Sequence, residues 1–207
     1  MLQTLGKFFG LPAAASHNAA DVDQLLMLLH VLMVLLFIGW SIFFIYTLWR
    51  FRQKRQPRAN YTGPKTHAST YIEVAVAMAE LVLLFALAIP YWARAVDKFP
   101  DPNESTVMRV IARQFNWTAR YPGADGQFGA SRLELVTADN PMGLDKEDPA
   151  AKDDVVTGID EMAAPVNKPV SAYLTSMDVI HSFKLTPLRI TQDATPGLVV
   201  PIHFTPN

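Results

Sequence analysis

The sequence predicts a membrane α plus all-β protein, with a two-helix transmembrane hairpin followed by a Greek-key β-barrel or sandwich. Two long apolar runs lie in the first half of the 207 residues, and each can cross a bilayer as a helix. After Trp92 the pattern changes to short alternating apolar runs separated by Pro, Gly, Asn and Asp, which is typical of all-β domains. Half of the residues are hydrophobic, enough for a membrane segment and one exported core.

The two predicted spans are residues 25–49 and 71–92. The first carries no charged residue over its whole length, which exceeds the roughly 20 residues that a membrane helix needs. His30 is a lone polar residue in it, and we expect a structural role for this side chain. The second span ends on Tyr91 and Trp92, an aromatic pair typical of a membrane interface.

The connecting loop, residues 50–70, indicates the topology. Its basic residues are Arg50, Arg52, Lys54, Arg55, Arg58 and Lys65. Residues 1–24 contain only Lys7 as a basic residue, and short cationic loops stay in the cytoplasm. We therefore expect both termini and the β domain, residues 93–207, on the periplasmic side of a bacterial cytoplasmic membrane. A cleaved signal peptide is the alternative for the N-terminus, but its apolar stretch is short and broken, so residues 1–24 are expected to form an ordered extracytoplasmic segment.

Two carboxylates lie inside the second span. Glu73 and Glu80 are seven residues apart and share one helix face, and ionisable groups within a span usually face protein or water. For Glu73, near the cytoplasmic end, an interfacial carboxylate and a proton-path residue both remain open. Glu80 lies deeper, and its burial requires a partner subunit.

The β domain has five predicted strands and one long insertion. The strands are expected at residues 107–114, 115–121, 170–175, 179–184 and 198–204. The insertion, residues 122–165, carries Asp139, Asp145, Glu147, Asp148, Asp153 and Asp154. Regular calcium-loop spacing is missing, so we interpret these carboxylates as solvated surface, with an acidic face for a basic redox partner as the other possibility.

The composition excludes several function classes. The formal net charge of −1 argues against a nucleic-acid-binding surface. The sequence has no cysteine, which excludes disulfides, thiol catalysis and a complete thiolate-ligated metal site within these residues. It also lacks phosphate-loop, dinucleotide and Ser-His-Asp motifs.

Three short motifs follow the hairpin in order: QFNW at 114–117, DVIHSF at 178–183 and QDATPG at 192–197. Together they resemble subunit II of the haem-copper terminal oxidases, the cytochrome c oxidase subunit II family, of bacterial type. The resemblance implies a cupredoxin-like barrel with a dinuclear copper centre. It also implies electron transfer from cytochrome c to haem in subunit I, where oxygen is reduced to water with proton pumping, and contacts with other oxidase subunits.

The resemblance also assigns roles to individual residues. It implies that His181 is a copper ligand, that Asp178 takes part in docking cytochrome c, and that electrons enter through Phe115 or Trp117. Which aromatic side chain receives the electron stays open. Glu73 resembles the family glutamate at the mouth of a proton pathway into subunit I, and Glu80 lies on the same helix face.

The sequence departs from the family at its end. The remaining copper ligands of the family are two Cys, a His and a Met in a C-terminal segment, and residues 1–207 stop at HFTPN where that segment would begin. We expect the segment to follow Asn207, with a separate chain or loss of the copper as alternatives. A copper-free quinol oxidase subunit and a docking subunit of a respiratory supercomplex are the competing functions.

The basic loop predicts a hairpin with both ends outside. Protease added to sealed right-side-out vesicles should cleave the domain after Trp92 and leave the loop 50–70 intact, because the loop is cytoplasmic. Cleavage of the loop with protection of the β domain would reverse the topology.

Overall fold

The computed structural model describes residues 6, 10–58, 61–63 and 65–207, and these residues group into two compact units. Asp21–Trp92 forms a helical unit, and residues 10–20 join Ala93–Asn207 in a β unit. Two long apolar helices followed by a β-sheet domain are the predicted fold class, which is confirmed.

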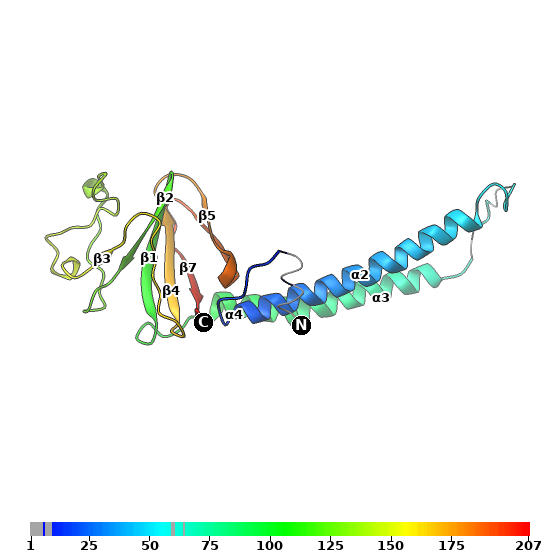
Figure 1. Ribbon diagram of the computed structural model, residues 1–207, viewed down its shortest axis with the longest axis horizontal. Helices are drawn as coiled ribbons and strands as arrows, with labels where there is room; N and C mark the ends of the chain where they lie inside the picture. The colour runs from blue at the N-terminus through cyan, green and yellow to red at the C-terminus, as the bar shows by residue number, and fades with distance from the viewer. Residues whose placement is uncertain (1–5, 7–9, 59–60, 64) are drawn as a thin grey trace. The chain divides into compact units, whose positions relative to one another are not determined.

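The helical unit is a hairpin of two helices that are long and apolar enough to cross a membrane. The first is α2 (Ala19–Arg50), and the second runs through α3 (Ala68–Leu83), the π-helical turn η1 (Leu84–Ala88) and α4 (Ile89–Asp97). Figure 1 shows α2 and α3 side by side, joined by the basic loop. Both helices extend beyond the predicted spans.

Local chemistry explains this extension. Asp21 in the first turn of α2 and Arg50 at its end carry charges that favour the two ends of the helix dipole. In the second helix the π-helical turn ends at Ala88, two residues before Pro90, which has no amide hydrogen to donate. The helix therefore continues past the proline, to Asp97.

The β unit contains a five-stranded sheet in the order β3-β2-β1-β4-β7 and a separate hairpin of β5 and β6 (Figure 1). The strands are β1 (Thr106–Arg113), β2 (Asn116–Tyr121), β3 (Val155–Val156), β4 (Val170–Ser176), β5 (His181–Leu185), β6 (Ile190–Ala194) and β7 (Val200–Phe204). The central strands β1 and β4 are parallel, and β2 and β7 flank them antiparallel. Each of the five predicted strands is found, with shifted ends, whereas β3 and β6 were not predicted.

Alternation along the central strands defines the core face of the sheet. Met108, Val110 and Ala112 of β1 are buried there with every second residue of β4, and Phe183 of β5 packs against them. The predicted strand 179–184 begins only at His181, because residues 177–180 form a loop held by side-chain hydrogen bonds. The first three residues of the motif at 192–197 belong to β6.

The N-terminal segment completes one edge of the β unit. Ser16 bridges Pro206, and the amide of His17 donates to the carbonyl of Thr205 at 3.0 Å. The Ser16 hydroxyl donates to the carbonyl of Leu188 at 2.7 Å. Residues 10–18 are thus part of the β unit, while residues 1–5 and 7–9 of the predicted N-terminal segment lie outside the described residues.

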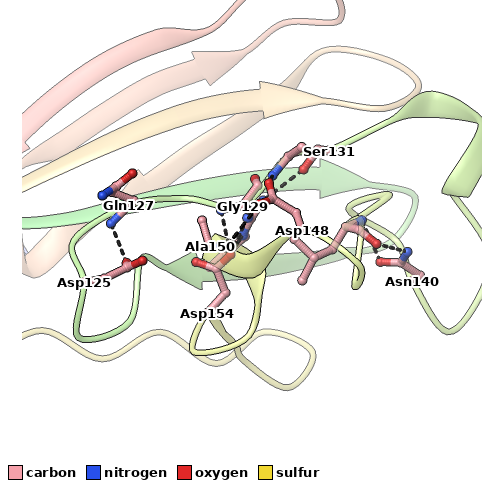
Figure 2. A network of polar contacts seen from close by, with 11 residues as sticks. Asp125, Gln127, Gly129, Ser131, Asn140, Asp148, Ala150 and Asp154 are labelled. Atoms are coloured by element: carbon pink, nitrogen blue, oxygen red, sulfur yellow. Dashed lines mark hydrogen bonds and ion pairs between the residues drawn. The ribbon is translucent and has the colours of Figure 1, made fainter.

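The acidic insertion is fixed by a buried ion pair, which makes the prediction of a solvated surface wrong for Asp154. The side chains of Asp154 and Arg120 are 0% and 1% exposed, and the guanidinium donates to the carboxylate. Arg120 also donates to the carbonyl of Gly129 at 2.6 Å and to the Ser131 hydroxyl at 2.9 Å. Figure 2 shows Gly129, Ser131 and Asp154 close together in this network. The insertion therefore folds over β2 through the arginine of that strand.

Other carboxylates of the insertion accept backbone hydrogen bonds. Asp148 accepts from the amides of Ala130, at 2.6 Å, and Ala150, at 3.1 Å, and the Ala130 bond is the main cause that holds its pKa below the usual range (Figure 2). Asp153 accepts from the amide of Ala124 at 2.6 Å. Met142, Leu144 and Ala151 are the buried apolar residues of the insertion.

The buried pair predicts a large stability effect. Asp154→Ala should lower the free energy of unfolding by about 3–5 kcal/mol, because it leaves the Arg120 guanidinium buried without a counter-ion. Pulse proteolysis in urea on the detergent-solubilised protein measures this change. Asp139→Ala, at an exposed carboxylate of the same insertion, is the matched control and should change it by less than about 0.5 kcal/mol. Equal effects of the two substitutions would contradict the anchoring role of Asp154.

Candidate functional site

The three sequence motifs meet at one end of the β unit. The turn between β1 and β2 carries Gln114 and Phe115, and the loop from β4 to β5 carries Asp178. His181 pairs in register with Ala194 of the third motif, and Ser176 bridges Pro196. Segments far apart in the sequence therefore form one cluster.

The carboxylate of Asp178 holds this cluster together. One oxygen accepts a hydrogen bond from the backbone amide of Gln114 at 2.6 Å. The other accepts from the amide of Val179 at 2.7 Å and lies 2.7 Å from Nε2 of His181. The single side chain thus ties the β1–β2 turn to the start of β5.

The charge of Asp178 determines the state of the histidine. The hydrogen bond with His181, followed by that from the Gln114 amide, holds the pKa of Asp178 far below its usual range, so the carboxylate is ionised. An ionised carboxylate only accepts, so Nε2 of His181 carries the hydrogen. In neutral imidazole Nδ1 then holds a lone pair, and within the described residues Nδ1 has no hydrogen-bond partner. This nitrogen is available as a ligand, and the imidazole side chain is 17% exposed.

The two aromatic candidates lie in different environments. Trp117 packs edge-to-face against His181, with ring centroids 5.9 Å apart, and against Phe183 at 5.3 Å. Phe115 is 90% exposed, and among the described residues its ring makes no aromatic contact. The structure therefore brings Trp117, and not Phe115, to the histidine.

Exposed apolar residues flank members of the cluster along the chain. Phe115 lies beside the Gln114 amide that Asp178 binds, and Met177, Val179 and Ile180 are 39%, 48% and 63% exposed on the loop that carries Asp178. We call these four residues the apolar rim. Large exposed apolar patches on soluble domains mark contact surfaces.

Two positioning residues were not predicted from the sequence. The Ser176 hydroxyl donates to the carbonyl of Val179 and so shapes the loop that carries Asp178. Asp160 accepts from the amide of Trp117 at 2.8 Å and has a left-handed backbone, with φ of 59°. Ser176 follows directly on a predicted strand, which could have indicated a loop-shaping role, whereas Asp160 lies in the insertion, where no pattern identifies it.

The remaining predicted residues, Glu73 and Glu80, lie in α3 of the helical unit. Both are exposed on the hairpin, and neither carboxylate makes a hydrogen bond or ion pair with another described residue. The described part of the hairpin thus provides no partner for either carboxylate.

A dinuclear copper centre needs bridging thiolates together with imidazole donors. The sequence contains no cysteine, and the described residues contain no group of three or more His, Cys, Asp or Glu that could hold a metal ion. His181 offers one nitrogen donor. Residues 1–207 alone therefore do not fit such a centre.

Comparisons with known proteins identify the family. Residues 106–207, which include all three motifs, match the family model described as the periplasmic domain of cytochrome c oxidase subunit II. A relative, the alternative cytochrome c oxidase subunit 2 of Bradyrhizobium diazoefficiens, is 30% identical over 165 residues. The chain belongs to the cytochrome c oxidase subunit II family. The resemblance seen in the motifs is thereby confirmed.

The matches cover most of this subunit II chain. The Bradyrhizobium match covers 80% of this chain and 58% of the relative. Cytochrome c oxidase subunit 2 of Cereibacter sphaeroides is 26% identical over 206 residues, covering 94% of this chain and 66% of the relative. A crystal structure of the periplasmic domain of subunit II of cytochrome oxidase of Bradyrhizobium japonicum is 25% identical, with a TM-score of 0.33, and the match covers 51% of this chain and 65% of that one. The chain thus spans about three fifths of the length of the first relative.

Proposed function

We propose that this chain is the electron-input subunit of a respiratory haem-copper oxidase, which accepts electrons from cytochrome c and passes them to haem in subunit I. The observation that carries the proposal is the cluster of Asp178, His181 and Trp117, built from two of the motifs within the region that matches subunit II. Oxygen reduction and proton pumping then belong to the assembled oxidase.

The copper assignment rests on the nitrogen that His181 leaves free. A dinuclear copper centre, when bound, supplies reversible one-electron chemistry. Asp178 fixes the tautomer and ring orientation of His181, as carboxylates next to metal-binding histidines commonly do. Because the sequence has no cysteine, the proposal requires thiolate donors from outside residues 1–207.

The surface around the cluster suits a cationic redox partner. The negative charge of Asp178 is 30% exposed, and residues of the apolar rim flank it along the chain. Charge complementarity steers the encounter, while apolar contact provides a short-lived interface. In this arrangement Trp117, or Phe115 at the tip, lies between the partner and His181.

The helical unit supports a membrane location. We assign the two apolar helices to a bacterial cytoplasmic membrane, with the β unit on the periplasmic side and the hairpin against other oxidase subunits. Glu73 and Glu80 then face subunit I as part of a proton pathway. Both carboxylates lack a partner among the described residues, which supports this assignment.

A copper-free quinol oxidase subunit and a supercomplex docking subunit are the competing functions. In both, His181 would be a packing residue. Its unpartnered Nδ1 favours the ligand role, because packed histidines usually use both ring nitrogens.

The copper assignment makes a direct prediction for the assembled oxidase. His181→Ala should lower its copper content and abolish the near-infrared absorption of a mixed-valence copper pair, because one lost imidazole leaves the site under-coordinated. Cytochrome c oxidation should then fail, while haem remains assembled and is still reduced by an artificial donor. Elemental analysis, absorption spectra and donor kinetics measure these effects.

Two variants serve as controls. His203→Ala removes a strand histidine of the same β unit, whose Nε2 lies 3.2 Å from the Arg94 carbonyl, and should keep the copper. Asp178→Asn keeps an acceptor for His181 but removes the charge, so it should keep copper and raise the KM for cytochrome c. If His181→Ala retains full copper and normal cytochrome c oxidation, a copper-free function replaces the proposal.

Glu80 predicts a specific contact in the assembled oxidase. A carboxylate that faces lipid at this depth costs about 2–3 kcal/mol, so Glu80 should lie within hydrogen-bond distance of a polar group or water on a partner helix. A structure of the complex tests this placement. Glu80→Leu should also reduce the amount of subunit I that copurifies, whereas Val82→Leu, at an exposed apolar position of the same helix, should not. A lipid-facing Glu80 without a polar neighbour contradicts the assignment.

A further inference from the structure

The face of the sheet opposite the core contains a pocket that the proposed function does not use. Its volume is about 590 Å³, which lies within the range of about 300–1,000 Å³ typical of small-molecule sites. Strands β1 and β4 form its floor, and the insertion contributes walls from Gly126, Phe128, Ser131 and Met142. None of Trp117, Asp178 and His181 lines it.

The register of the sheet determines which side chains form the floor. Met108 and Val110 are buried in the core, so the side chain of Arg109 between them lies on the opposite face. Arg109 is paired with Arg120 of β2 on one side and with Tyr173 of β4 on the other. A row of two guanidinium groups and a phenol thus crosses three strands, next to the apolar residues Val107 and Ile111.

Arg109 is a cation without a counter-ion in the part of the chain that the structure describes. Its side chain makes no hydrogen bond or ion pair there, and the guanidinium lies over the ring of Phe128, 4.4 Å from the centroid. The carboxylate of Asp154 pairs with Arg120 instead. Partial burial and, next, the charge of Arg120 lower the pKa of Arg109, so its surroundings disfavour the positive charge.

The charge and the lining together indicate the class of ligand. The guanidinium groups of Arg109 and Arg120 and the carboxylate of Asp154 together carry a net charge of +1. One monovalent anion balances this charge. The fork of an arginine matches a carboxylate, and the Tyr173 and Thr175 hydroxyls in the lining offer further hydrogen bonds. Phe128, Met142 and Ile111 add apolar surface to the lining around these polar groups. We propose that the pocket binds a small organic carboxylate with an apolar or aromatic body, with Arg109 as its anchor.

Benzoate is the probe, titrated into the purified oxidase with its full subunit II and followed by ligand-observed NMR. Benzyl alcohol, with the same ring and no charge, and inorganic phosphate, with charge and no ring, complete the set. Benzoate should bind with a dissociation constant in the millimolar range or tighter, and neither comparison ligand should displace it at equal concentration.

The variants locate the binding. Arg109→Gln should weaken benzoate binding about tenfold or more, because a charge-assisted hydrogen bond is lost. Arg132→Gln removes another guanidinium, one on the insertion that pairs with Asp145, and should leave binding unchanged. Tyr173→Phe keeps Arg109 and the ring and should weaken binding about threefold to tenfold, which tests the site even if Arg109→Gln does not fold.

Several results would overturn the proposal. These are the absence of benzoate binding to the unmodified oxidase, equal binding by the Arg109→Gln variant, and loss of binding in Arg132→Gln. Displacement by benzyl alcohol would show an apolar site that ignores charge, and displacement by phosphate would show a general anion site. Failure of the copper assignment would leave all of these measurements unaffected.

Discussion

The parallel pairing of β1 with β4 is the constraint on which the rest of the β unit depends. Thr106 is in register with Val170 and Ala112 with Ser176, so the two central strands end at the same edge of the sheet. Parallel strands cannot be joined by a tight turn, so the chain between them must cross over. In this chain the connection from β1 to β4 consists of β2, the insertion and the short β3. The pairing of β1 with β4 fixes both ends of this connection. The register of β1 with β4 therefore positions both the cluster around Asp178, at the ends of the strands, and the pocket around Arg109, on the face of the sheet.

At the strand ends, this register brings Gln114 and Asp178 together across 64 positions of sequence. The Asp178 carboxylate accepts hydrogen bonds from two backbone amides and an imidazole. These bonds order the loop between β4 and β5. The carboxylate also selects one tautomer of His181. In the proposed copper role, the fold would thus orient the donor nitrogen, and the protein would reorganise little on binding the metal.

The helical hairpin and five strands could be predicted from the sequence, because each depends on local periodicity. The family resemblance could be recognised because it depends on three short motifs. The contact of Trp117 with His181 could not be derived from either motif alone, since it depends on how two distant segments pack. The second predicted span ends at Trp92, but after the π-helical turn the helix continues to Asp97. The acidic residues of the insertion were interpreted as one solvated group, yet Asp154 is buried against Arg120. Composition gives the charge of such a segment, whereas its partner lies on a strand 34 residues away.

The pairing of residues 10–18 with the end of β7 links the biosynthesis of the two units. The hydrogen bond from Ser16 to Leu188 spans 172 positions, and both transmembrane helices lie inside the loop that it closes. Such a loop can close only when its two ends are on the same side of the bilayer, so an odd number of crossings between them is incompatible with this contact. In the topology proposed above, the edge of the β unit therefore stays open during synthesis until the second helix has been inserted and β7 has reached the periplasmic side. Translocation and folding thus finish in a fixed order, and a chain stalled between the two helices would expose an unpaired strand edge to the quality-control proteases of the compartment.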